Sequence, residues 1–183
     1  VVIVAIVILA ILTYEVSHFV FRHRKRQTLY QKAKRIAEKT GKPLLVIGDP
    51  KNGLGTRITR SQPYGYGDIC IDLNGCPNAP SGVKIIQGDI CEEIKKFPSA
   101  SCVIYTSCVL EYIDKEISAM EELIADLYKV SGGDLFVVNI NRYCLTAYYY
   151  HVLTKDSWKS RNVILTKETP DGKTASIEFK KIS

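Results

Sequence analysis

The sequence predicts an α/β domain with a doubly wound, mostly parallel β-sheet and a C-terminal antiparallel hairpin, preceded by a transmembrane helix. Three observations lead to this prediction. Residues 1–21 are almost entirely apolar. Short apolar runs then alternate with helix-forming and turn-forming stretches between residues 43 and 140. Residues 162–180 contain two strand-like segments on either side of a Pro-Asp-Gly turn.

Residues 1–21 have the length and hydropathy of a membrane-spanning helix. A helix of about 20 apolar residues crosses the hydrocarbon core of a bilayer, and Val1–Leu12 has no polar side chain. A basic cluster follows directly, made of Arg22, Arg24, Lys25 and Arg26. This order is typical of a single-pass anchor whose basic side stays in the cytosol. A buried core helix and a cleaved signal peptide are the alternatives, although a signal peptide carries its charges before the apolar run.

The positive charge of the chain is concentrated beside this anchor. Residues 1–42 contain nine Lys and Arg against two acidic residues, whereas residues 43–183 contain sixteen basic and seventeen acidic residues. Residues 22–42 therefore predict a basic juxtamembrane helix, which stops at Gly41 and Pro43. The α/β domain is predicted over residues 43–183. Its balanced charge gives no indication of binding to a nucleic-acid backbone.

The six cysteines form no CxxC pair and have no zinc-ligand spacing with the three histidines, so no metal site is predicted. Cys70 and Cys102 lie inside apolar runs and are predicted to be small core residues. A reducing compartment fits the cytosolic orientation of the domain.

The apolar runs of the domain predict five strands, which lie at 44–47, 68–72, 83–87, 102–105 and 135–140. Continuous apolar runs of this length are typical of parallel strands that are buried on both faces. The spacing of apolar residues predicts an amphipathic helix over 117–130, and shorter helices are predicted at 91–96 and 143–153. The segments 162–167 and 174–180 predict the hairpin.

Ligands of such sheets bind beyond the carboxyl ends of the strands, so the loops after the first three strands are the candidate site. The first loop, VIGDPKNGLG, is rich in glycine. Asp72 ends the second strand and follows Gly48 by 24 residues, a spacing suited to a carboxylate that binds ribose hydroxyls. Asp89 follows the third strand and is placed to accept from an exocyclic amino group. The alternatives are a turn residue for Asp72 and a helix cap for Asp89.

The succession LLVIGDPKNG, DICIDLNG, VKIIQGDI, SCVIYTSCVLEYID and LYKVSGGDLFVV resembles class I S-adenosylmethionine-dependent methyltransferases. Its most specific part is Ser107–Ile113, followed about twenty residues later by Leu127–Gly133, which is similar to the VLEH and LxRVLKPGG motifs of that family. The resemblance covers about residues 29–181. It implies a Rossmann-like methyltransferase fold, in which the terminal hairpin supplies the antiparallel strand at the edge of the sheet.

The resemblance also implies a binding site for S-adenosylmethionine, but no catalytic side chain. Gly48 and the amides of Asn52 and Gly53 would face the methionine part of the cofactor. The remaining implied site residues are Asp72 and Leu73 at the ribose, Asp89 and Ile90 at the adenine, and Tyr105 and Ser107 beneath the sulfonium. The aromatic segment 143–150 is open to interpretation as a substrate wall, an interaction surface or a packed helix, and His151 as a helix-surface residue.

The first loop departs from the family pattern in three places. Val46 stands where the family usually has an acidic residue, Pro50 stands where it has a second glycine, and Lys51 brings a positive charge towards a cationic sulfonium. Two functions are therefore weighed. The first is a membrane-anchored methyltransferase of unknown substrate. The second is a catalytically inactive methyltransferase-like domain that serves as a membrane-tethered structural or assembly protein, for example in a membrane-containing virus particle. A dinucleotide or nucleotide-sugar enzyme is a third, weaker reading.

Overall fold

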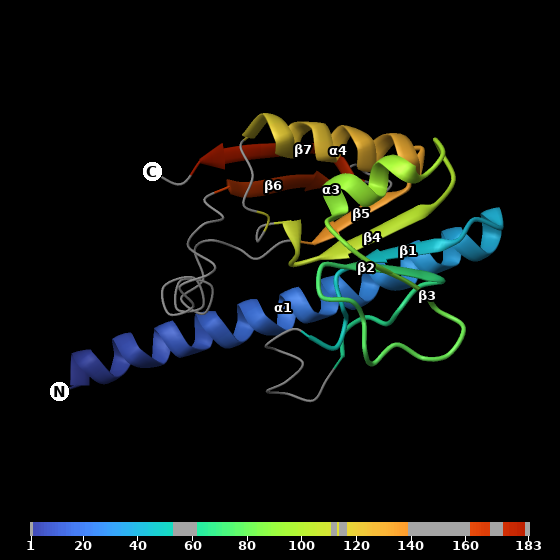
Figure 1. Cartoon of the computed structure of the whole chain (residues 1–183). Helices are drawn as coiled ribbons and strands as arrows, with labels where there is room; N and C mark the ends of the chain where they lie inside the picture. Colours follow the sequence, from blue (N-terminus) through green and yellow to red (C-terminus); the bar gives the residue numbers. More distant parts are fainter. Residues whose placement is uncertain are drawn as a thin grey trace.

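The protein, described by a computed structural model over residues 2–52, 62–110, 113, 117–138, 162–168 and 174–181, contains one five-stranded parallel sheet (Figure 1). Its strands are β1 (Leu44–Ile47), β2 (Ile69–Asp72), β3 (Lys84–Gln87), β4 (Val103–Ser107) and β5 (Leu135–Val138). Their order in the sheet is β3-β2-β1-β4-β5. The predicted α/β class with a parallel sheet is confirmed, and the strand bounds agree with the predicted ones to within two residues wherever both ends are described.

The central strands are buried along their whole length, which explains their continuous apolar sequences. Every residue of β1, β4 and β5 is buried. In contrast, β3 lies at one edge of the sheet and is largely exposed. Parallel neighbours bring Val46 opposite Cys70 on one side and Tyr105 on the other. Since all five strands point the same way, their carboxyl ends lie at one edge of the sheet, which we call the carboxyl edge.

Helices cover both faces of the sheet. One face packs against the long helix α1 (Val2–Thr40), through buried residues Leu29, Tyr30, Ala33 and Ala37. The other face packs against α3 (Ile90–Glu93), the following 3-10 turn η1 (Ile94–Lys96) and α4 (Ile117–Ser131). The two apolar cores, one on each side of the sheet, are those of a doubly wound domain.

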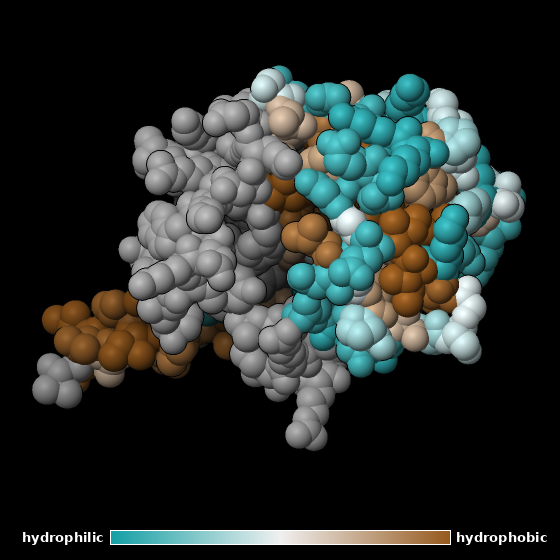
Figure 2. Space-filling view, in the orientation of Figure 1, coloured by the Kyte–Doolittle hydropathy of each residue, from teal (hydrophilic) through white to brown (hydrophobic). Residues whose placement is uncertain are grey.

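Helix α1 is twice as long as the part that packs on the sheet. Its apolar side chains from Val2 to Phe21 are exposed in the structure, and they form the brown projection in Figure 2. This part has a mean hydropathy of 2.2 over its most apolar window, and the helix is long and apolar enough to cross a membrane. The predicted segments 1–21 and 22–42 are thus parts of one continuous helix, and the second part belongs to the core of the domain.

The predicted hairpin is formed by β6 (Asn162–Glu168) and β7 (Thr174–Lys181), which pair antiparallel. The two strands make a sheet of their own and do not extend the five-stranded sheet. The predicted helix 143–153, His151 within it, and the hairpin turn at 169–173 lie outside the described residues.

Candidate functional site

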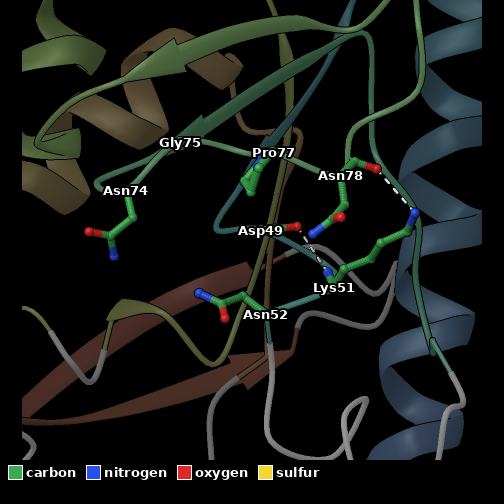
Figure 3. A pocket seen from close by; sticks show the side chains of 7 residues that line it. All are labelled: Asp49, Lys51, Asn52, Asn74, Gly75, Pro77 and Asn78. Carbon is green, nitrogen blue, oxygen red and sulfur yellow. Dashed lines mark hydrogen bonds between the residues drawn. The ribbon is translucent and has the colours of Figure 1, made fainter.

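The loops that follow β1 and β2 enclose a cleft of about 200 Å³ at the carboxyl edge (Figure 3). Its lining residues are Asp49, Lys51, Asn52, Asn74, Gly75, Pro77 and Asn78. They come from the first loop and from the LNGCPN turn after β2. Asn52 is the one residue among the described members of the predicted cofactor site that lines this cleft. The asparagines of the second loop were missed, although a polar turn directly after Asp72 is a usable signal.

Position 48 requires a glycine because the segment after β4 packs closely against it. Its φ is +89°, in the left-handed region, and its backbone N–H donates to the carbonyl of Ile71 at 2.8 Å. A side chain at this position would overlap with Cγ2 of Val109. The close approach of Val109 therefore explains Gly48 without any ligand.

Asp49 holds the first loop together from a buried position. It is 8% exposed, and its carboxylate accepts from the backbone N–H of Lys51 at 3.0 Å and from the hydroxyl of Tyr66. Burial, together with this hydrogen bond, raises the pKa of Tyr66 well above its ordinary value. The ammonium of Lys51 lies 6.0 Å from the centre of the Tyr66 ring and donates to the carbonyl of Asn78 at 3.0 Å. Lys51 thus joins the two loops across the cleft.

Asp72 links the same two loops by hydrogen bonds. One carboxylate oxygen accepts from the backbone N–H of Asp49 at 3.0 Å, and the other accepts from that of Asn74 at 2.8 Å. Its backbone carbonyl accepts from Gly75 and Gly88. These contacts are those of a turn residue, which was the alternative interpretation of Asp72. The neighbouring Leu73 is 67% exposed on the outside of the turn.

Asp89 caps the short helix α3, as the second interpretation of this residue predicts. Its side chain accepts from the backbone N–H of Cys91 at 2.9 Å, and it is the N-cap residue of the helix. The adjacent Ile90 is buried in the core between the sheet and α4. Neither residue lines the cleft.

Tyr105 and Ser107 lie on the α1 face of the sheet, not at the cleft. The Tyr105 ring is fully buried, and its hydroxyl donates to the backbone carbonyl of Arg26 at 3.0 Å. Ser107 accepts from Nε of Arg26 at 2.7 Å, and the guanidinium lies 5.0 Å from the centre of the Tyr64 ring. Arg26, predicted as part of the membrane-facing basic cluster, is therefore held by the domain. Gly53 lies outside the described residues.

Tyr64 makes the stability of the domain sensitive to alkaline pH. Burial raises the pKa of Tyr64 to about 12, and the nearby Arg26 only partly opposes this effect. The unfolded tyrosine has a pKa of about 10. Between these two values the unfolded chain loses its proton first, so the free energy of unfolding falls as pH rises, by about 2–3 kcal/mol in total.

Denaturant titrations from pH 9 upward should show this loss of stability, and Tyr64→Phe should remove part of the dependence of the unfolding free energy on pH. The matched change Tyr128→Phe, at a half-exposed ring, should leave this dependence as it is.

The sheet and the second loop carry a cysteine pair that can form a disulfide. Cys70 lies in β2, and Cys76 lies within the turn that lines the cleft. The two cysteines have no recognisable motif spacing, so this pair could not be predicted from the sequence. The burial of Cys70 and Cys102 is confirmed, and among the described cysteines Cys91, Cys102 and Cys108 form no disulfide. Among the described residues, no group of three or more His, Cys, Asp or Glu is placed to hold a metal ion.

Comparison of the chain with protein-family models, curated proteins and solved structures finds no match. The functional argument therefore rests on the structure of the chain itself.

Several described residues that the resemblance assigns to S-adenosylmethionine have contacts inside the protein. The open side of Gly48 is filled by Val109, and both oxygens of Asp72 accept from backbone N–H groups. Tyr105 points into the opposite core. These contacts give Gly48, Asp72 and Tyr105 a role within the fold.

Proposed function

We propose that the chain is a single-pass membrane protein whose methyltransferase-like α/β domain serves as a membrane-tethered structural or assembly module. The observation that carries this proposal is helix α1. From Val2 to Leu12 its exposed surface is apolar on all sides, and the apolar side chains Val16, Val20 and Phe21 extend it, which is unfavourable in water over so large an area. Its second part is an integral layer of the domain. The protein is thus built to hold a folded α/β domain at a fixed place beside a bilayer.

The basic cluster after Phe21 supports a cytosolic location of the domain, since cytoplasmic flanks of membrane helices are rich in Lys and Arg. This location has a consequence for the Cys70–Cys76 pair. The cytosol keeps thiols reduced, whereas secreted and lumenal domains keep disulfides. Alkylation of intact cells before lysis should therefore find Cys70 and Cys76 as thiols. A pair that resists alkylation until a reductant is added would place the domain on the other side of the membrane.

A methyltransferase is the second candidate. The strand order β3-β2-β1-β4-β5 and the position of Asp72 at the end of β2 favour it. The internal contacts of Gly48, Asp72 and Ser107 favour the structural role. A fold can outlast its original site, because core packing and ligand binding make separate demands on the sequence.

Calorimetry with S-adenosylmethionine, on the full chain in detergent micelles, separates the two candidates. We expect no heat of binding from protein that is folded by circular dichroism. The structural proposal would be wrong if the cofactor bound and if Asp72→Asn, at an unchanged unfolding temperature, weakened the binding. Glu38→Gln, an exposed change on α1 far from the cleft, provides the matched control.

A further inference from the structure

Helix α1 has no break between its apolar part and the part that packs on the sheet. It runs without interruption from Val2 to Thr40 and contains neither glycine nor proline. Sharp kinks in helices arise mainly at such residues. The domain is therefore attached to its apolar segment by a rigid rod, and the position of the sheet on this rod fixes how the domain faces a membrane.

Two contacts define the direction of the sheet along α1. Near the apolar segment, Arg26 meets the last residue of β4, through the bond from its Nε to the hydroxyl of Ser107. Beyond the far end of the helix, the carbonyl of Pro43 accepts from the N–H of Val103, the first residue of β4, at 3.0 Å. Helix α1 thus runs antiparallel to the strands, and the carboxyl edge is the edge nearest the apolar segment (Figure 1).

The number of helix residues between the apolar segment and Arg26 gives the distance from the membrane core to the carboxyl edge. Arg26 is five positions after Phe21, the last exposed apolar residue of α1. At a rise of 1.5 Å per residue, this is about 8 Å along the helix axis. A headgroup layer is about 5–8 Å thick, from the difference between the whole bilayer and its hydrocarbon core. The carboxyl edge thus lies at the outer limit of the headgroups. The opposite edge lies about 16 Å further out, because β4 has five residues.

Charged side chains at this level suit phospholipid headgroups. Arg24 is exposed on the turn of α1 between Phe21 and Arg26, and Lys51 is exposed on the loop after β1. The carboxylates of the same edge, Asp49 and Asp72, accept hydrogen bonds from within the loops. The exposed guanidinium of Arg24 can meet lipid phosphates, and the ammonium of Lys51, which donates one hydrogen bond to the carbonyl of Asn78, has two further N–H groups for a phosphate oxygen.

We infer that the described part of the carboxyl edge, formed by the ends of β1 and β2 and by the cleft residues that follow them, lies against the phospholipid headgroup layer, and that the surface it contacts is the membrane itself. This inference rests on the membrane anchoring proposed above. It predicts that the loop after β2 is close to the headgroups and that the amino end of β3 is remote from them.

A short-range fluorescence quenching experiment tests the orientation. The full chain is reconstituted into vesicles of phosphatidylcholine and phosphatidylserine that contain a lipid with a spin-labelled headgroup. A fluorescent amino acid replaces either Asn74 or Ser81; both are exposed and belong to the same loop, Asn74 at its carboxyl-edge end and Ser81 at the opposite end. We expect the label at position 74 to be quenched severalfold more strongly than the label at position 81. Equal quenching, or stronger quenching at position 81, would overturn the inference.

A linker variant tests the role of the rigid helix. A flexible Gly-Ser segment inserted between Phe21 and Arg22 should abolish the difference between positions 74 and 81, while vesicles still carry the protein in flotation. A difference that persisted would show that α1 does not set the orientation. Failure of the wild-type protein to float with vesicles would instead refute the anchor, and with it the proposed function. The two failures are therefore distinguishable.

Discussion

Replacement of Ile8 and Leu12 by lysine is expected to release the protein from membranes. Both side chains lie in the apolar part of α1 and are more than half exposed, so they make no contribution to the core of the domain. Each lysine near the centre of a spanning helix costs about 2.5–3.5 kcal/mol of insertion free energy, and the pair about 5–7 kcal/mol. We expect the alkali-resistant membrane fraction to fall from most of the protein to a small remainder.

The matched variant, Ile8→Ala with Leu12→Ala, keeps the segment uncharged and should remain in the membrane fraction. Circular dichroism and the unfolding temperature of the domain should be the same in both variants, since neither residue contacts the sheet. If the double-lysine variant resisted alkaline extraction as well as the wild type does, residues 1–21 would not be the anchor.

Replacement of Gly48 by alanine is expected to lower the free energy of unfolding by about 2–5 kcal/mol. One part, about 1–2 kcal/mol, arises because the left-handed backbone at Gly48 disfavours a side chain. The other part, about 1–3 kcal/mol, arises because the new methyl group overlaps with the Val109 side chain. Chemical denaturation of the full chain in detergent measures the sum.

Two controls separate these parts. Gly82 has a similar φ of +95°, and a side chain there would meet no atom within 4 Å, so Gly82→Ala reports the backbone part alone. The double variant Gly48→Ala with Val109→Ala relieves the overlap and should recover the contact part in a double-mutant cycle. If Gly48→Ala were no worse than Gly82→Ala, Val109 would not close the open side of Gly48. The route past this glycine would then be available to a ligand.

The strands could be predicted from the sequence because a strand that is buried on both faces has a continuous run of apolar residues. Leu44–Ile47 is a run of four apolar residues, and all four are buried. Leu135–Val138 is similar. The end of α1 was also predictable, because Gly41 adopts a left-handed φ of +67° directly after the last helical residue.

The site was less predictable, because the same residue types serve structural and ligand-binding purposes. Asp89 can cap a helix or bind a base, and the structure makes it a cap. Tyr105 follows an apolar run that is buried on both sides, so the sequence does not indicate which face its side chain occupies. Its actual partners, Arg26 and Tyr64, are about 79 and 41 residues distant along the chain.

Hydropathy and length, which are local properties, were enough to predict an apolar helix at residues 1–21, a parallel α/β sheet and a terminal hairpin. The tertiary structure decided how these parts relate. It made the apolar segment and the first domain helix one rod, placed Val109 against Gly48 in the VIGDPKNGLG loop, and turned the carboxyl edge towards the apolar segment. These features depend on contacts between residues far apart in the chain, which hydropathy alone does not encode.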